Sequence, residues 1–308
     1  MKPIRLRDFI EDIDGWIYAV SAYDNHERAG CLLRYVPDDN GERTSVNGKR
    51  YKKLEFDDAF DLIRDNKPDY LNSLHRVPLN EIRKVMKPEE SIDHIVQRNK
   101  RVQKLISIFK IPLGSYGCTG SLLCGLENKE SDIDMVVYGE TWYEARTQLR
   151  NAIKNRLINP LSGDMWEKVY KKRVPEISFE TFVLHEKRKY NRGEIDGTYF
   201  DLLFTRSYEQ LGNISPTEKG EVLGKETIEA KVIDSSLSFD SPAVYLIDHE
   251  EYDRVMSFTH TYSGQALYGE TLEASGVCEQ HRNEKWLIVG TTRQAKGEYI
   301  VSKTLLDS

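Results

Sequence analysis

Two aspartates stand at the start of an apolar run that is typical of a buried β-strand. Asp132 and Asp134 flank Ile133, and the run continues over Met135–Tyr138. Side chains two apart on a strand share a face, so the two carboxylates project together, about 6–7 Å apart along the strand. Like charges aimed at one spot are stable together only in solvent or around cations. The segment therefore requires a sheet that presents this acidic face to a solvent-filled or cation-filled site.

A glycine and a serine precede this strand. Gly120 allows the backbone to approach a phosphate closely, and Ser121 is predicted to cap a short helix over residues 121–126. The cap would leave backbone N–H groups free to bind anionic oxygens. Gly125 would then turn the chain back toward the acidic strand.

The two parts together predict a site for a triphosphate and divalent cations. A two-metal site needs ions about 3.5–4 Å apart that carboxylates bridge. An isolated Asp-x-Asp is usually surface decoration, and an isolated Gly-Ser predicts nothing. The prediction depends on their order and spacing and on the apolar strand that continues from the acids.

The segment from Thr119 to Tyr138 resembles the signature of the DNA polymerase β-like nucleotidyltransferase superfamily. The shared pattern is Gly-Ser, a short spacer with a glycine, then Ser-Asp-Ile-Asp and an apolar strand. The motif resemblance covers roughly residues 91–205. The whole chain is similar to an uncharacterised group of archaeal predicted nucleotidyltransferases.

The resemblance implies the roles of individual residues. Gly120, Ser121 and Ser131 would bind the nucleotide, an NTP such as ATP. Asp132 and Asp134 would hold two Mg²⁺ or Mn²⁺ ions. The implied activity is in-line attack of an acceptor on the α-phosphate with release of pyrophosphate, on a mixed sheet flanked by helices.

Such enzymes usually add a third carboxylate from a later strand, which holds the catalytic metal and activates the acceptor hydroxyl. Residues 177–184 and 198–204 are both predicted as strands, and each contains one acid. We prefer Asp201, since an acid among aromatic and aliphatic neighbours is costly unless something pairs with it. Glu180 is the rival.

The chain divides into three predicted modules of an α+β protein. Residues 1–90 form an N-terminal α/β accessory module, with short strands over 4–55 and a helix from Phe56. Residues 91–215 form the polymerase β-like nucleotidyltransferase domain, which begins with one helix capped by Ser91. Residues 216–308 form a β-rich module, with strands over 255–268, 286–291 and 298–304. A small barrel is one architecture that these strands could form.

Charge is unevenly distributed along the chain. The net charge is −6 and the pI is about 5.8, which counts against a protein that coats nucleic acid. The span 146–192, however, has twelve basic residues against five acidic ones. We expect this span to border the cleft and to bind a γ-phosphate or a polyanionic acceptor such as RNA. Its densest part is Lys187, Arg188 and Lys189.

The remaining features exclude other classes. No apolar run approaches the roughly 20 residues needed to span a bilayer, and no secretory signal is visible, so we expect a cytoplasmic protein without membrane partners. The four cysteines show no zinc spacing and are expected to be reduced thiols. The seven histidines are scattered and are interpreted as structural.

Two other function classes compete with an active transferase whose hydroxyl acceptor is RNA, a protein or a small molecule. One is a catalytically inactive, nucleotide-binding or RNA-binding regulatory module on the same fold. Loss of an acid would favour it, yet all three candidate acids are present. The other is a scaffold in which the terminal modules carry the function.

Overall fold

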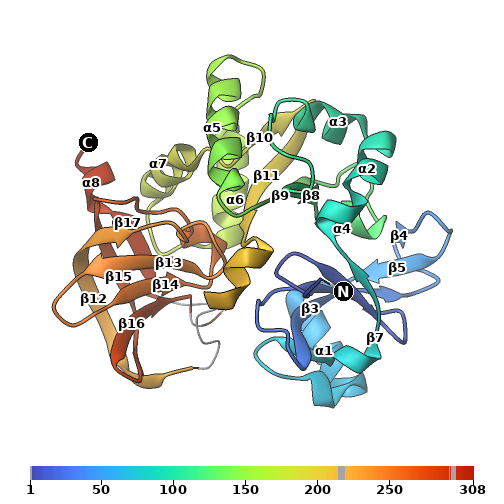
Figure 1. Ribbon diagram of the computed structural model, residues 1–308, viewed down its shortest axis with the longest axis horizontal. Coiled ribbons are helices and arrows are strands. Elements are labelled where there is room, and N and C mark those ends of the chain that lie inside the picture. Colours follow the sequence, from blue (N-terminus) through green and yellow to red (C-terminus); the bar gives the residue numbers. More distant parts are fainter. Residues whose placement is uncertain (1, 214–218, 291, 293–295) are drawn as a thin grey trace. The chain divides into compact units, whose positions relative to one another are not determined.

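The computed structural model describes residues 2–213, 219–290, 292 and 296–308 (Figure 1). The chain forms two compact units: unit 1 is Met1–Asn159 with Asn191–Ser215, and unit 2 is Pro160–Tyr190 with Pro216–Ser308. The architecture is mixed, with several sheets and helices, as expected for an α+β protein. The predicted boundary at residue 90 falls inside unit 1. Unit 2 includes a segment, 160–190, from within the predicted transferase domain.

The first sheet of unit 1 is formed by the N-terminal residues. Its strand order is β4-β5-β3-β2-β1-β7, and β6 pairs with β3. The strands are β1 (Phe9–Asp12), β2 (Ile17–Val20), β3 (Arg28–Pro37), β4 (Arg43–Thr44), β5 (Arg50–Lys53), β6 (His75–Pro78) and β7 (Ile82–Met86). Helix α1 (Phe56–Asn66) buries Ala59 and Ile63 in the core of this sheet. The predicted short strands and the helix from Phe56 are confirmed.

The second sheet of unit 1 contains the acidic strand. Its order is β10-β11-β9-β8, formed by β8 (Tyr116–Cys118), β9 (Ile133–Tyr138), β10 (Arg192–Ile195) and β11 (Thr198–Thr205). Strands β9 and β11 are parallel, and the other neighbours are antiparallel. The predicted strands at 133–138 and 198–204 are confirmed.

Helix α5 (Thr141–Lys154) covers one face of the second sheet. Its Trp142 is fully buried, donates from the indole N–H to the Leu202 carbonyl over 3.3 Å, and meets the Phe204 ring edge-on at 6.0 Å. Side chains alternate along a strand, so residues on either side of Leu202, Asp201 among them, face away from α5. The helix thus leaves the acidic face of the sheet open to other parts of unit 1.

A buried cation joins the two sheets of unit 1. The Arg5 guanidinium lies between the rings of Tyr138 and Tyr208, 3.6 Å and 3.8 Å from their centroids. It is also 3.0 Å from Glu89, which accepts hydrogen bonds from both tyrosine hydroxyls. A desolvated ion pair of this kind is costly to break, because one partner would remain buried and unpaired. The N-terminal residues are therefore part of the same unit as the acidic strand.

The predicted single helix after Pro88 is two helices, and the cap assignment was wrong. They are α2 (Pro88–Arg98) and α3 (Lys100–Ile106). Pro88 is the first helical residue after an N-cap at Lys87, so Ser91 lies inside the first turn. Asn99 breaks the run because its side chain accepts from Arg101 N and Val102 N and so caps α3.

The strand predicted over residues 177–184 was wrong, because a helix of unit 2 begins at Phe179 within that segment. Unit 2 has helices α6 (Gly163–Arg173), α7 (Phe179–Lys189) and α8 (Lys303–Leu306). The Ser178 side chain caps α7 by accepting from Thr181 N. Phe182 and His185 are buried at helical spacing, and basic residues fill the last turn, where they suit the helix dipole. A short apolar run fits the residue spacing of a helix as well as that of a strand. Here the Ser178 cap determines that the segment is a helix.

The strands of unit 2 close into a ring. They are β12 (Glu221–Asp234), β13 (Ala243–Asp248), β14 (Arg254–Ser257), β15 (Thr271–His281), β16 (Glu284–Val289) and β17 (Tyr299–Ser302). Pairing runs β12-β13-β14-β16-β15, and β15 pairs again with β12, which makes a five-stranded barrel with β17 beside β15. Only β14 and β16 are parallel among these pairs of the described residues.

The predicted strand at 255–268 was too long. Strand β14 ends at Ser257, and a short 3-10 turn follows at His260–Tyr262, because the Thr259 side chain accepts from Thr261 N and turns the chain. The strands predicted near 286–291 and 298–304 are present as β16 and β17. Among the helices of the described residues, none is long and apolar enough to cross a membrane.

Candidate functional site

The two central acids lie side by side on adjacent parallel strands. In the β9–β11 pairing Asp134 is directly opposite Asp201. Both carboxylates are half-buried, and they project from the same face, because paired residues of neighbouring strands share a face. Asp132 lies just before β9, two residues from Asp134, and is exposed. The structure thus brings together three acids from chain positions nearly 70 residues apart.

Gly120 lies directly against this cluster. Its φ is +68°, and a Cβ atom built on it would be 2.7 Å from the Asp134 Oδ2 atom. Any other residue would strain the backbone and collide with the carboxylate. The sequence pattern Gly-Ser is therefore explained by close approach to the acid itself.

Ser121 is not the helix cap that we predicted. Helix α4 (Gly120–Cys124) begins one residue earlier, with Thr119 as the N-cap residue and Gly125 in the left-handed conformation at its end. The Thr119 hydroxyl makes no capping bond and donates instead to the Arg7 carbonyl over 2.6 Å. Ser121 is half-buried in the first turn of α4.

Ser131 holds the loop in front of the acids. Its hydroxyl accepts from the Asn128 backbone N–H at 2.9 Å and from Arg43 at 3.2 Å, and donates to the Asn128 side-chain carbonyl at 3.0 Å. Arg43 also donates to the Leu126 carbonyl at 3.3 Å. In this structure Ser131 therefore shapes the loop that leads into Asp132, and a strand of the first sheet supports it.

Burial and neighbouring like charges change the pKa of Asp134. Burial, and after it the neighbouring carboxylates of Asp201 and Asp132, raise the pKa of Asp134 to about 6, although Arg7 and Arg34 act to lower it. A carboxyl with such a pKa binds protons and metal ions competitively near neutral pH. Perturbed groups of this kind cluster at functional sites.

A cation is in contact with the third acid. Arg192 is directly opposite Asp201 in the β10–β11 pairing, and its Nε atom is 3.3 Å from the Asp201 Oδ1 atom. Both side chains are largely buried, with exposed fractions of 5% for Arg192 and 16% for Asp201. The Oδ1 atom is buried and accepts no hydrogen bond from the described residues. Asp201 thus has a buried oxygen that is in an ion pair but accepts no hydrogen bond from the described residues.

These residues fit divalent cations in chemistry. Carboxylate oxygens are the ligands that Mg²⁺ prefers, and a cation would relieve the repulsion between Asp134 and Asp201. Across the described residues, no three His, Cys, Asp or Glu side chains form a ready ligand group for one ion. The residues here that could hold a cation are Asp132, Asp134 and Asp201.

The first sheet supplies cations that the sequence reasoning missed. Arg7 and Arg34 both lie within electrostatic range of Asp134, and Arg43 reaches Ser131. These arginines precede the motif by about 80 to 130 residues. No local pattern signals such contacts, so only the three-dimensional arrangement identifies them.

The rival acid and the basic span are placed differently from our expectation. Glu180 is exposed in the first turn of α7, so it is not on a strand of the acidic sheet. The basic span 146–192 does not form one surface: it is divided between α5 in unit 1, α6 and α7 in unit 2, and β10 in unit 1.

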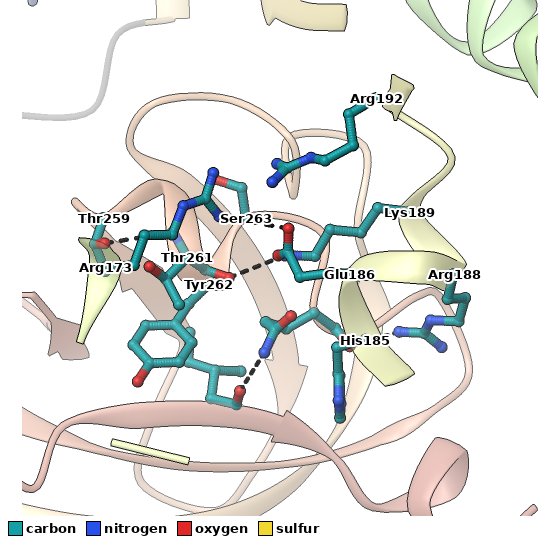
Figure 2. A network of polar contacts seen from close by, with 12 residues as sticks. Arg173, His185, Glu186, Arg188, Lys189, Arg192, Thr259, Thr261, Tyr262 and Ser263 are labelled. Carbon is teal, nitrogen blue, oxygen red and sulfur yellow. Dashed lines mark hydrogen bonds and ion pairs between the residues drawn. The ribbon is translucent and has the colours of Figure 1, made fainter. Parts of the chain in front are cut away.

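The densest part of that span faces inward (Figure 2). Lys189 is buried and pairs with the equally buried Glu186, and its ammonium also donates to the Thr261 carbonyl at 2.9 Å. Arg188 pairs with Glu270. Only Lys187 of the three is exposed. These cations hold α7 to the barrel of unit 2.

The cysteines and histidines near these elements have structural environments. Cys118 and Cys124 both precede the loop that leads into Asp132, and burial raises the pKa of both thiols, that of Cys118 to about 12. All four cysteines are free thiols. Burial lowers the pKa of His75 and of His185 to about 4, so both rings are neutral.

Comparisons with known proteins show the family of this chain. No family model matches the chain, and no solved structure matches it. The chain is 36% identical to the uncharacterized protein MJ1086 of Methanocaldococcus jannaschii over 338 aligned positions, which cover 97% of this chain and 99% of that protein. At this identity and coverage, the chain belongs to the same family as MJ1086.

Proposed function

We propose that this protein is a metal-dependent nucleotidyltransferase that moves a nucleoside monophosphate from an NTP to a hydroxyl acceptor. The observation that carries the proposal is the parallel pairing of Asp134 with Asp201, with Gly120 packed against the Asp134 carboxylate. Two carboxylates that repel each other on adjacent strands suit cations that bind a triphosphate. The motif resemblance supports the same activity.

The residues divide the chemistry between them. Asp132 and Asp134 would hold two Mg²⁺ or Mn²⁺ ions, which neutralise the triphosphate when they are bound, and Gly120 and Ser121 would contact its oxygens. Asp201 accepts the proton of the acceptor hydroxyl. The hydroxyl oxygen forms a bond to the α-phosphorus, the bond from that phosphorus to the bridging oxygen breaks, and pyrophosphate leaves.

The acceptor is less constrained. RNA loses support, because the densest basic residues of the span 146–192 pair inside unit 2. The segment Pro216–Ser308, which includes the barrel, has sixteen acidic and nine basic residues, so it would repel a polyanion. A protein or small-molecule hydroxyl is therefore favoured. An NTP substrate and free thiols are consistent with a cytoplasmic enzyme.

One observation favours a second candidate, a catalytically inactive nucleotide-binding module. Arg192 lies where it can neutralise Asp201 without any metal. If that pair is permanent, the chain would bind an NTP and not turn it over.

Transfer of label separates the two functions. The protein is incubated with NTPs labelled at the α- or the γ-phosphate, Mg²⁺ or Mn²⁺, and separate RNA, protein and small-molecule pools. The transferase predicts α-label in one pool and γ-label in released pyrophosphate. Bound but unchanged NTP supports the inactive module, and γ-label in an acceptor pool excludes both.

A further inference from the structure

The turn that leads into β1 holds an arginine in an unusual backbone conformation. Residues 5–8 form a tight turn, closed by a hydrogen bond from Asp8 N to the Arg5 carbonyl at 3.1 Å. Arg7 is the third residue of this turn and has a φ of +75°. That position favours glycine, because a side chain there strains the backbone. An arginine at a glycine position indicates that its side chain has a use.

Buried charges fix the turn on both sides of Arg7. Arg5, 2% exposed, is held between two tyrosine rings and pairs with Glu89. Asp8 is fully buried and pairs with the Lys87 ammonium at 2.7 Å. Such pairs add little stability compared with apolar packing, but they define one conformation. The turn is therefore rigid, and the start of the Arg7 side chain is fixed.

Thr119 connects this turn to the acidic cluster. Its backbone N–H donates to the Asp134 carbonyl at 2.9 Å, and its hydroxyl donates to the Arg7 carbonyl at 2.6 Å. Arg7 thus lies within two hydrogen bonds of the acidic strand, beside Gly120. The Arg7 charge also lies within electrostatic range of the Asp134 carboxylate.

We infer that Arg7 is a substrate-binding residue that the N-terminal sheet contributes to the acidic site, where its guanidinium binds phosphate oxygens of a triphosphate. This inference rests on the proposed function. Guanidinium groups bind phosphate with paired, charge-assisted hydrogen bonds. In the proposed enzyme the acids hold metal ions, and the Arg7 guanidinium would contact the triphosphate independently of those ions. The N-terminal sheet then has a function in substrate binding.

Glycine substitution gives a sharp test, because it removes the side chain and relieves the backbone. Arg7→Gly should bind ATP and inorganic triphosphate, each measured by calorimetry with Ca²⁺, at least tenfold more weakly than the wild type. Arg7→Lys should be intermediate. The melting temperature of Arg7→Gly in EDTA should equal or exceed that of the wild type. Arg282→Gly is the matched control, since Arg282 is exposed with a φ of 53° in a turn of unit 2.

Each outcome has a defined meaning. Unchanged triphosphate affinity in Arg7→Gly and in Arg7→Asn, which also tolerates the conformation, overturns the inference and leaves the proposed function intact. A clear loss of melting temperature in both variants overturns it too, because Arg7 would then be structural. If the wild type binds neither ATP nor inorganic triphosphate, the proposed function itself fails. Weaker binding in Arg282→Gly would show that the effect is not specific to the site, which also overturns the inference.

Discussion

Unit 1 and unit 2 each contain a buried group of charged side chains, and the two groups are built in opposite ways. In unit 2, Glu186 pairs with Lys189 and is 3.4 Å from Arg173, so the charges are matched (Figure 2). In unit 1, Arg192 pairs with Asp201, but Asp134 and Asp201 still repel each other across adjacent strands. Matched charges define a fold, whereas we propose that the repelling pair is retained for a ligand that the chain does not itself provide.

The largest expected effect comes from removing one acid of the repelling pair. Asp134→Asn should lower nucleotide transfer on the order of a thousandfold or more, because it removes a ligand of both ions and each 1.36 kcal/mol of barrier is about tenfold. The check is label transfer at saturating NTP. Glu180→Gln, exposed in α7, is the control and should remain active. A tenth of wild-type activity in Asp134→Asn would exclude the metal assignment.

In the matched group of unit 2, we expect a substitution to lower the stability of the protein. Glu186→Ala should destabilise the protein by about 3 kcal/mol, because Lys189 remains buried without its partner. Urea unfolding of the full chain measures it. Replacing the pair together, Glu186→Leu with Lys189→Met, should restore much of the loss. If Glu186→Ala unfolds like the wild type, the matched group is not structural and the comparison fails.

Features of the fold and the site that depend on neighbouring residues could be predicted from the sequence. Features that depend on contacts between residues far apart in the chain could not. The acidic strand and Asp201 were predictable, because alternation and an acid in an apolar run are local. Helix α7 was not predicted, because the run 177–184 fits the spacing of a strand as well as that of a helix and the cap at Ser178 was not recognised. Counting charges could not show that Lys189 faces inward. The contribution of Arg7 depends on a contact 112 residues away along the chain.

Metal binding should depend on pH with a defined sign. Burial and the neighbouring carboxylates raise the pKa of Asp134 to about 6, so protons compete with cations below that value. Affinity for Mn²⁺ should fall up to about tenfold per pH unit below pH 6 and be nearly constant above it. Titrations from pH 4.5 to 8 test this. A constant affinity down to pH 4.5 would contradict the raised pKa.

The smallest effect concerns stability. A carboxyl whose pKa is raised in the folded state holds its proton more tightly there, so its ionisation destabilises the fold between about pH 4 and 6, fully above 6. In EDTA at pH 7.5, Asp134→Asn should therefore be as stable as the wild type or up to about 1 kcal/mol more stable. The difference should vanish near pH 4. Thermal melts at both pH values measure it, and a clearly less stable Asp134→Asn at pH 7.5 would make Asp134 structural.

Direct counting of bound cations tests the central claim, that the repelling acids exist to bind metal. Mn²⁺ is titrated into the protein with a non-hydrolysable ATP analogue, and bound ions are counted by electron paramagnetic resonance. We predict two ions for the wild type, at most one for Asp201→Asn and none for Asp134→Asn. Equal binding by the three proteins, or none by the wild type, would contradict the account.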